Sequence, residues 1–387
     1  MKILIAPGAF KHSLTARAAA EAIARGIRRS GLEAELVLLP IADGGNGTLD
    51  AFLAGGGQRI QERVVDPLGR PLLASYGLLN DGETAIVEMA LASGLELLRP
   101  GELSPLLTTT YGTGQLLKSA LEKGTKRIII GMGGSATVDG GAGCLQALGV
   151  RLLDPYGRDV VVGGGALTSI YSIDPSGLDA RWKTVEVIIA SDVDNPAVGD
   201  QGAAAVFGPQ KGAGPHEVRV LEAGLHHFFT KVRDQMGVDV LDVPGGGAAG
   251  AFSAGLMAFL SGHIQSGVDL VLKYNDFDYQ VEDSYLVITG EGRMDEQTIH
   301  GKGPIGVARR ALRWGVKTIA IVGSLNADDA LLHEAGIQAV LPIVTQPMSL
   351  DDALRNAPKL VEQAALRLGY LLQLKGKVNF RGKLAEY

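Results

Sequence analysis

Short apolar runs alternate with amphipathic stretches at the beginning of the chain. Lys2–Ala6 is an apolar run typical of a buried strand, and Glu35–Leu39 is a second one. Between them, apolar residues recur at helical spacing from Thr15, which can cap a helix, to Gly31, which can end it. A further helix is expected around Thr48–Ala54. This order of strand, helix, strand and helix is typical of a parallel sheet.

The same alternation resumes near the far end of the chain. There the pattern predicts strands and helices in turn, at Tyr285–Thr289, Ile305–Trp314, Thr318–Val322, Ala327–Ala335, Ala339–Ile343 and Leu350–Leu372, the last with Ser349 and Asp352 as a capping box. Together the two ends predict five strand–helix repeats, which favours a flavodoxin-like doubly wound parallel sheet of order 2-1-3-4-5. The expected fold is therefore a split α/β domain made of residues 1–58 and 284–387.

Residues 59–283 are then expected to form a second, inserted α/β domain. The pattern predicts a meander of three strands followed by helices and further strands, at Arg59–Val65, Ala74–Leu79, Thr84–Glu88, Tyr111–Lys123, Arg127–Gly131, Gly140–Leu148, Val185–Ala190, Glu217–Met236 and Ala249–Phe259. A length of 387 residues fits two domains better than one. Because ligands of open α/β sheets bind beyond the carboxyl ends of the strands, we expect the active site in the cleft between the two domains.

Composition and charge narrow the class of protein. The chain is 46% hydrophobic, and no apolar run reaches the ~18 residues that suggest a membrane span. A net charge of −6 gives no general attraction for nucleic acid or for an anionic membrane. The single cysteine, Cys144, excludes an internal disulfide and fits a reducing compartment. We therefore expect a cytoplasmic protein, monomer or homodimer, that binds small molecules.

The 54 glycines gather in clusters, and the densest cluster is GMGGSATVDGGAG at residues 131–143. It follows a predicted strand and leads into a predicted helix, so free amides there could face a phosphate. The candidates for phosphate contact are Gly133, Gly134, Ser135, Thr137, Gly140 and Gly141. Asp139 could act through Mg²⁺ or cap the helix, and Lys211 in VFGPQKGA could assist, unless it is a solvated loop lysine. The alternative is a glycine-rich structural turn, since neither a P-loop nor a dinucleotide fingerprint is present.

Charged residues alternate in the segment ITGEGRMDEQT, which follows the strand predicted to end at Thr289. Two glycines would let the backbone turn sharply there, and Glu291, Arg293 and Asp295 would project at alternate positions. An arginine between two acids can hold a carboxylate or a phosphate bidentately, while an acid nearby binds Mg²⁺. The alternative is a polar turn whose charges pair with one another.

Further acids and a lysine follow other predicted strands. Asp43 could act as a base toward a substrate hydroxyl or hold Mg²⁺, or it could cap the helix that follows. Asp192 and Asp194 are a plausible set of ligands for a hard cation, although the same residues before a proline also form ordinary turns. Lys11, with Ser13, could neutralise an anionic substrate or simply be solvated.

Taken in order, these segments resemble the bacterial class I glycerate kinases, also called glycerate 2-kinases. The segments that carry the resemblance are APGAFKHSLTA, PIADGGNGT, GMGGSATVDGGAGCLQALG, ASDVDNP, VFGPQKGA, GAAGAFSAGLMAFL and ITGEGRMDEQT with GKGPIGVA, from residue 3 to about 372. The resemblance implies two α/β domains, ATP, Mg²⁺ and D-glycerate, with 2-phosphoglycerate as the usual product. A kinase for the 3-hydroxyl or for another small hydroxy acid stays open.

The candidate residues suggest a division of roles. Glycerate would be held by Arg293 and Lys11, helped by Ser13 and Glu291, and Asp43 would accept the proton of the substrate hydroxyl. The glycine segment with Lys211 would bind ATP, and Asp192, Asp194 and Asp295 would hold Mg²⁺. Two positions depart from the family pattern, namely Gly8-Ala9 in place of Asp-Ser, and Asn46 in place of Glu. Both changes remove an acid, so a catalytically impaired, ligand-binding homologue is the other alternative.

Overall fold

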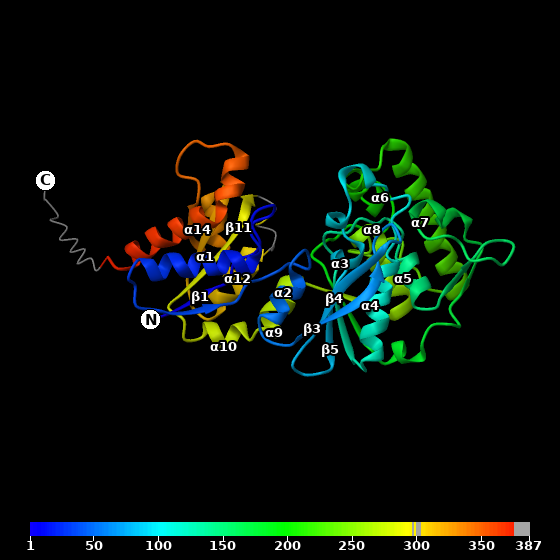
Figure 1. Ribbon diagram of the computed structural model, residues 1–387, viewed down its shortest axis with the longest axis horizontal. Coiled ribbons are helices and arrows are strands. Elements are labelled where there is room, and N and C mark those ends of the chain that lie inside the picture. Colours follow the sequence, from blue (N-terminus) through cyan, green and yellow to red (C-terminus); the bar gives the residue numbers. More distant parts are fainter. Residues whose placement is uncertain (296–297, 299–302, 375–387) are drawn as a thin grey trace, which may run out of the picture. The chain divides into compact units, whose positions relative to one another are not determined.

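The computed structural model describes residues 1–295, 298 and 303–374, and these form two compact units. Unit 1 comprises Met1–Pro40 with the described residues from Asp278 onward, and unit 2 comprises Ile41–Phe277. In Figure 1, unit 1 carries the blue and the yellow-to-red parts of the chain, and unit 2 mostly the cyan and green parts. The sequence had suggested boundaries at 58/59 and 283/284. The difference at the first boundary arises because the helix at Thr48–Leu53 contacts strands and a helix of unit 2.

Unit 1 is built on one parallel sheet. Its strands are β1 (Lys2–Ile5), β2 (Glu35–Leu38), β11 (Leu286–Asp295), β12 (Thr318–Asn326) and β13 (Ile337–Pro342). Its helices are α1 (Ala16–Arg29), α12 (Gly303–Arg313), α13 (Asp329–Glu334) and α14 (Leu350–Leu372), and α10 (Phe277–Val281) begins at the boundary. Within the described residues the strand order is β13-β12-β11-β1-β2, with parallel pairing throughout. Counted along unit 1 this is 2-1-3-4-5, so the predicted flavodoxin-like order is confirmed.

Helices cover both faces of this sheet, because successive side chains of a strand point to opposite faces. On β12, Ile321 belongs to the apolar core that α1 and α14 close. Its neighbours Ala320 and Val322 belong to a separate core with Ile305 of α12 and Leu332 of α13. The alternation explains why all three residues are buried apolar residues, as a doubly wound sheet requires.

Strand β11 runs further than the sequence predicted. Instead of turning after Thr289, it stays paired with β12 as far as Asp295, which lies opposite Asn326. The glycines that suggested a turn serve close backbone contact instead, since a Cβ atom on Gly290 would lie 1.9 Å from the carbonyl oxygen of Ile321. The charged residues of this segment therefore extend from a strand and not from a turn.

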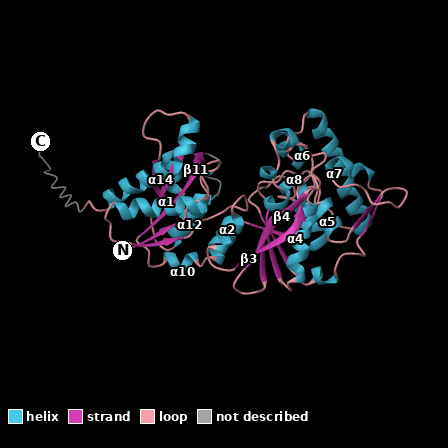
Figure 2. Cartoon of the chain, in the orientation of Figure 1, coloured by secondary structure: helices cyan, strands magenta, loops and turns pink. Residues whose placement is uncertain are grey.

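Unit 2 contains a larger, mixed sheet. Its strands are β3 (Gln58–Val65), β4 (Pro71–Leu78), β5 (Thr84–Glu88), β6 (Arg127–Gly131), β9 (Glu186–Ala190) and β10 (His263–Gln265), with β7 (Arg151–Leu153) and β8 (Ser172–Asp174) as a separate antiparallel pair. Its helices are α2 (Thr48–Leu53), α3 (Ala90–Ser93), α4 (Tyr111–Glu122), α5 (Ala142–Ala147), α6 (Ala203–Phe207), α7 (Pro215–Met236), α8 (Ala248–Leu260) and α9 (Gly267–Tyr274). Figure 2 shows these strands in magenta among the helices. The predicted meander of three strands is confirmed as β3, β4 and β5.

The sheet of unit 2 has one edge where most of the polar loops gather. Strands β5, β6, β9 and β10 are parallel neighbours, so their carboxyl ends lie along the same edge. The segments that leave them carry the glycine cluster after Gly131, the acids after Ala190 and the turn after Gln265. Parallel sheets bind ligands at such an edge. Among the described residues, no helix is both long enough and apolar enough to cross a lipid bilayer.

Candidate functional site

The loop that carries Asp43 lies along the carboxyl edge of the unit 2 sheet. The carbonyl oxygen of Gly44 accepts a hydrogen bond from the amide of Gly133, after β6, at 2.8 Å. A Cβ atom on Gly44 would lie 2.3 Å from the carbonyl oxygen of Ala190, at the end of β9. A Cβ atom on Gly267, after β10, would lie 2.4 Å from the carbonyl carbon of Asp43. The loop thus touches the ends of three strands, and glycine makes these backbone contacts possible.

Asp43 lies near a second acid, Asp192, which follows β9. The Asp192 carboxylate receives hydrogen bonds from Ser266 and Gly267. Within the described chain its Oδ2 atom is buried without a partner. Burial, together with the charge of Asp43, raises the pKa of Asp192 to about 6. A carboxylate oxygen with unused lone pairs beside another acid suits a hard divalent cation or a shared proton.

The alternative role for Asp43, as a cap of helix α2, is not what the structure shows. The amides of Gly47 and Leu49 donate instead to the two carboxylate oxygens of Glu88, at 3.0 and 2.9 Å. Glu88 is buried, and burial raises its pKa. Asp43 is exposed and accepts one bond, from the amide of Gly45 at 3.1 Å. Sequence reasoning missed Glu88, although an acid at the end of the apolar run Thr84–Glu88 was a signal.

Only part of the glycine segment after β6 has free amides. Gly133, Gly140 and Gly141 donate to protein oxygens, at 2.8, 3.0 and 3.1 Å. Within the described chain, the amides of Gly134 and Ser135 donate to no protein acceptor. Helix α5 begins only at Ala142 and has six residues, so its end offers little to an anion. Because Gly134 is exposed whereas Thr137 is fully buried, Gly134–Ser135 is the stretch that a phosphate could reach.

Asp139 organises the inner part of this segment. It is fully buried, and its carboxylate accepts hydrogen bonds from the amide of Thr110 at 2.8 Å and from the Thr110 hydroxyl at 2.9 Å. The amides of Gly141 and Gly143 donate to it as well, at 3.1 and 3.3 Å. Burial raises the pKa of Asp139 despite these bonds. Asp139 therefore joins the glycine segment to the start of α4, and it has no exposed face for Mg²⁺.

Lys211 is a buried residue and not a solvated one. It ends a short 3-10 helix, η5 (Pro209–Lys211), and only 2% of its surface is exposed. Its Nζ donates to Ser135 Oγ and to the carbonyl oxygen of Thr137, each at 2.7 Å. Burial lowers the pKa of Lys211 to about 7. The lysine therefore contacts the glycine segment from its buried side.

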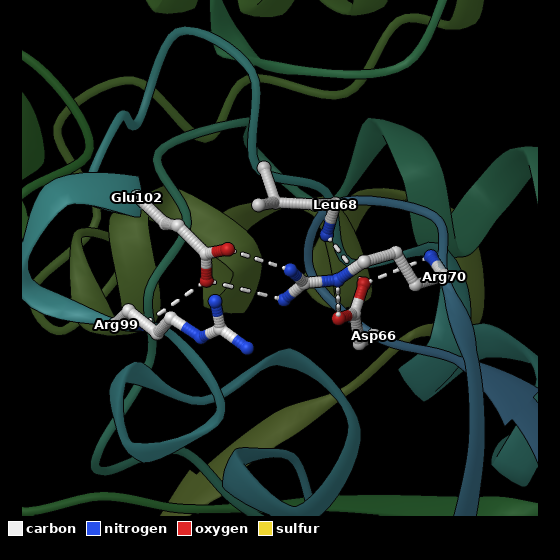
Figure 3. Close-up of polar contacts among 5 residues, drawn as sticks. All are labelled: Asp66, Leu68, Arg70, Arg99 and Glu102. Atoms are coloured by element: carbon white, nitrogen blue, oxygen red, sulfur yellow. Dashed lines mark hydrogen bonds and ion pairs between the residues drawn. The ribbon is translucent and has the colours of Figure 1, made fainter.

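A network of charged side chains holds the segment before Leu103, which packs next to Lys211. Figure 3 shows its members, Asp66, Leu68, Arg70, Arg99 and Glu102. The Arg70 guanidinium donates to Asp66 at 2.5 Å and, through two nitrogens, to both oxygens of Glu102 at 2.8 and 3.3 Å. The next residue, Leu103, packs on the turn after Lys211, because a Cβ atom on Gly212 would lie 2.6 Å from its carbonyl oxygen. The β3–β4 turn is thereby connected to the neighbourhood of Lys211.

A strained turn lies against the same segment. Ala249, Gly250 and Ala251, in the first part of α8, have φ values of 55°, 70° and 64°. Left-handed backbone costs about 1–2 kcal/mol for a residue with a Cβ atom. A Cβ atom on Gly250 would lie 2.0 Å from the carbonyl oxygen of Thr137. Strain of this kind often marks functional sites. The sequence had suggested an ordinary helix here.

In unit 1, the candidate substrate residues lie at the end of β11 and after β1. Arg293 is 66% exposed and pairs with Asp295, its Nε lying 3.1 Å from Oδ2. Glu291 accepts a hydrogen bond from the hydroxyl of Thr298 at 2.9 Å. A Cβ atom on Gly292 would lie 3.2 Å from the amide nitrogen of Lys11, so the two segments are neighbours. Lys11 and Arg293 thus belong to neighbouring segments of unit 1.

The remaining candidate residues of unit 1 are exposed, hydrogen-bonded locally or outside the described residues. Lys11 is exposed, and Ser13 donates its hydroxyl to the carbonyl oxygen of Phe10 at 3.0 Å. Residues 296–297 and 299–302, which complete the charged segment, lie outside the described residues, as does the tail from 375.

The structure does not gather the three acids expected to bind Mg²⁺ within one unit. Asp192 and Asp194 belong to unit 2, where Asp194 is exposed, and Asp295 belongs to unit 1. Across residues 1–295, 298 and 303–374, no cluster of three or more His, Cys, Asp or Glu side chains could hold a metal. Asp192 instead lies within electrostatic reach of Asp43 and Asp269, whose charges both raise its pKa.

The two positions that depart from the family pattern have simple surroundings. Gly8 donates its amide to the carbonyl oxygen of Gly290 at 2.8 Å. The Asn46 side chain donates to Glu96 at 2.8 Å, a bond that a glutamate could not make while charged. Asn46 also lies beside the exposed Gly134.

Comparisons with known proteins agree with this two-unit α/β arrangement. The sequence model of the Glycerate kinase family matches residues 3–373. The chain is 47% identical to a glycerate kinase of Bacillus subtilis, over 97% of this chain and 98% of that protein. It is 48% identical to a glycerate 2-kinase of Escherichia coli, over 92% of this chain and 94% of that protein.

A solved structure shows the same likeness in three dimensions. A crystal structure of a protein named glycerate kinase 2 from Salmonella typhimurium LT2 matches with a TM-score of 0.84 and 45% identity, over 96% of this chain and 98% of that one. These matches define the class of the protein, which is a small-molecule kinase of α/β fold. The chain belongs to the glycerate kinase family.

Proposed function

We propose that this protein transfers the γ-phosphoryl group of ATP to the 2-hydroxyl of D-glycerate, in the cytoplasm, and releases 2-phosphoglycerate and ADP. The observation that carries the proposal is the match to relatives named glycerate kinase over nearly the whole chain, among them one named glycerate 2-kinase. In this reaction the substrate oxygen forms a bond to phosphorus, the bond to ADP breaks, and the hydroxyl proton leaves to a base. Such catalysis consists mostly of positioning and of charge neutralisation.

Unit 2 would supply the base and the contacts to ATP. Asp43 is exposed, makes a single hydrogen bond and is free to accept the hydroxyl proton. The free amides of Gly134 and Ser135 would receive a phosphate oxygen. The unpartnered Oδ2 of Asp192, beside Asp43, fits a divalent cation, and Mg²⁺ bound there would neutralise phosphate charge. Asp194 and Asp295 stay as proposed further ligands.

Unit 1 would supply the contacts to glycerate. Arg293 carries an exposed guanidinium at the end of β11, and its fork of donors matches a carboxylate. Lys11 adds a second positive charge on the neighbouring segment. Ser13 is two residues from it in sequence, and Glu291 precedes its neighbour Gly292 in β11. Two cations beside one another suit the carboxylate of a small hydroxy acid.

The direct test is turnover by the purified protein. We expect ADP release with D-glycerate, ATP and Mg²⁺, and a product that enolase converts without a mutase, because only 2-phosphoglycerate is its substrate. A product that requires a mutase would replace the assignment with the 3-hydroxyl. Binding of ATP and glycerate by calorimetry without ADP release would favour the catalytically impaired homologue.

One variant tests the assigned glycerate contact. Arg293→Ala should raise the KM for glycerate by about 10²-fold or more, as expected for a lost charged hydrogen bond pair, while the KM for ATP stays near that of the wild type. Arg355→Ala is the matched control, since Arg355 is 74% exposed and pairs with its helical neighbour Asp352. An unchanged KM for glycerate in Arg293→Ala would remove Arg293 from the substrate site.

A further inference from the structure

We propose that Lys211 is a positioning residue that holds the ATP-binding segment in its working conformation from the buried side, acting through Ser135 and Thr137 and not by touching phosphate. The inference rests on the proposed function, because it assumes that Gly134–Ser135 receives a phosphate of ATP. It replaces the simpler expectation that this lysine is itself a phosphate ligand.

The first argument is access. The Lys211 side chain is 2% exposed and is among the largest fully buried side chains of the described chain. Its ammonium group is already engaged on the protein side of the segment, at 2.7 Å from Ser135 Oγ and 2.7 Å from the Thr137 carbonyl oxygen. A ligand at the exposed Gly134 would meet the other side of the same backbone.

The second argument is geometry. The two acceptors of Lys211 lie on either side of Ala136, so one nitrogen fixes both ends of that short stretch. Ala136 itself is held by its amide, which donates to Ser93 at 2.9 Å, and by its carbonyl oxygen, which accepts from the Thr108 hydroxyl at 2.8 Å. Without the lysine, the side chain of Ser135 and the carbonyl of Thr137 would lose their partner, and buried polar groups without partners drive rearrangement.

The third argument is that a lysine is a costly choice for a merely structural bond. Burial disfavours the charged amine, and among the groups that influence it Asp139 is the one acid that favours its charge. Asp139 is already committed to four hydrogen bonds with Thr110, Gly141 and Gly143. A positive charge that donates to the side chain of Ser135 adds to the attraction of the free amides of Gly134 and Ser135 for an anion. Function explains a residue that stability alone would not favour.

The surroundings keep the lysine in place. Glycine at position 212 allows Leu103 to close over the turn that follows Lys211, and Leu103 continues from Glu102, which Arg70 fixes by two hydrogen bonds. The backbone of the strained Gly250 turn also lies close to the Thr137 carbonyl oxygen that Lys211 binds. The lysine is therefore one of several contacts that define this carbonyl's position.

The test uses kinetics and ATP binding in three variants of the full-length protein. Lys211→Met, which keeps the volume but removes the donors, should raise the KM and the calorimetric Kd for ATP by about tenfold, the worth of one or two hydrogen bonds. The KM for glycerate should stay unchanged and kcat should stay within about threefold. Lys211→Gln, which keeps a donor, should recover part of the loss. Lys126→Met is the control, since Lys126 is 71% exposed in the same unit.

A double-mutant cycle shows whether Lys211 acts through Ser135. If it does, Lys211→Met with Ser135→Ala should weaken ATP binding no more than Lys211→Met alone. Additive effects together with a kcat loss of more than about 10²-fold would show direct action on the transferred phosphoryl group, and would overturn the inference. An unchanged Kd for ATP in Lys211→Met would overturn it as well.

Two measurements keep this result separate from that of the proposed function. Calorimetry with ATP needs no turnover, so the role of Lys211 is tested even if the protein does not phosphorylate glycerate. Circular dichroism melts check that each variant is folded. If Lys211→Met fails to fold, Lys211→Gln and Ser135→Ala carry the same test, and an unchanged Kd for ATP in both would reject the inference.

Discussion

The buried carboxylate of Asp139 accepts two hydrogen bonds from one residue, Thr110, through its amide at 2.8 Å and its hydroxyl at 2.9 Å. This pair joins the start of α4 to the segment that we propose for ATP. Two further amides donate to the same carboxylate, so both of its oxygens face donors.

Asp139→Asn should therefore destabilise the protein. The new amide nitrogen would face backbone N–H groups in place of an acceptor, and the free energy of unfolding should fall by about 2–4 kcal/mol. Urea denaturation measures the change. Asp159→Asn, at an acid whose side chain is 55% exposed, should change it by less than about 0.5 kcal/mol. Equal effects of the two substitutions would contradict the organising role of Asp139.

Asp43→Asn should separate catalysis from stability. If Asp43 accepts the substrate proton, kcat should fall by about 10²–10⁴-fold. The melting temperature should hardly change, because Glu88 and not Asp43 caps helix α2. Asp50→Asn, at an exposed acid in α2, is the matched control and should keep kcat near that of the wild type. A fall in kcat of less than tenfold would remove Asp43 as the base.

The stability of the protein should depend on pH through Asp192. Its pKa is about 6 in the folded protein and ordinarily 3.8, so the folded state binds more protons than the unfolded state between these values. Stability is therefore lost as the pH rises from about 4 to 6. Asp192→Asn should lack this loss, and the variant should gain melting temperature relative to the wild type across that range.

Melts at several pH values without divalent cations measure this effect, with Asp194→Asn as the exposed neighbouring control. At pH 7, Mg²⁺ should then raise the melting temperature of the wild type more than that of Asp192→Asn, because binding to the folded state stabilises it. Parallel melting curves for the wild type and Asp192→Asn at all pH values would argue against the raised pKa.

Because of the left-handed turn in α8, replacing alanine by glycine should change the stability in opposite directions at two positions of this helix. Ala249→Gly should stabilise the protein by about 0.5–1 kcal/mol, because glycine adopts a φ of 55° without the Cβ penalty. Ala254→Gly, in the regular part of the same helix, should destabilise it by about 1 kcal/mol. Thermal melts distinguish the two signs. A loss of stability in both variants would mean that the turn is not strained.

Gly8→Asp should be tolerated by the fold and should raise kcat. Gly8 does not have the positive φ that favours glycine, and a Cβ atom there would lie 3.5 Å from the Gly290 carbonyl oxygen, an ordinary contact. An acid at this position, as in the family pattern, should increase kcat by up to about tenfold if it assists proton or metal chemistry. Gly8→Ala controls for the added Cβ atom, and equal kcat values for the two variants would show that the acid is dispensable here.

The order of the unit 1 sheet could be predicted because each strand is recognisable from nearby sequence, as a short apolar run next to an amphipathic helix. The extension of β11 beyond Thr289 could not be predicted in this way. Gly290 and Gly292 suggest a turn when they are considered with their sequence neighbours, whereas their role depends on Ile321 and Phe10, which approach only in the fold. A glycine needed for close contact between strands looks the same in sequence as one needed for a turn.

In unit 2, the sequence indicated which residues belong with the glycine segment but not what surrounds them. Asp139 and Lys211 were both connected with the glycine segment from sequence, but their burial was not foreseen. Their local neighbours are small residues without an apolar period, so no pattern shows which face is covered. The left-handed backbone at Ala249 could not be predicted either, because an alanine-rich run favours a regular helix by propensity.

The pairing of β1 also determines the order in which the protein can fold as it leaves the ribosome. Strand β2 is made soon after β1, but Ile3 also lies opposite Leu286, so one edge of β1 must wait for a partner that is made after all of unit 2. Unit 2 needs no such wait, and its two ends meet where the Asn275 side chain donates to the carbonyl oxygen of Ala51 at 2.8 Å. Domains generally fold as units during synthesis, and an unpaired strand edge invites aggregation. The N-terminal segment is thus the part of the nascent chain that most needs protection until β11 emerges.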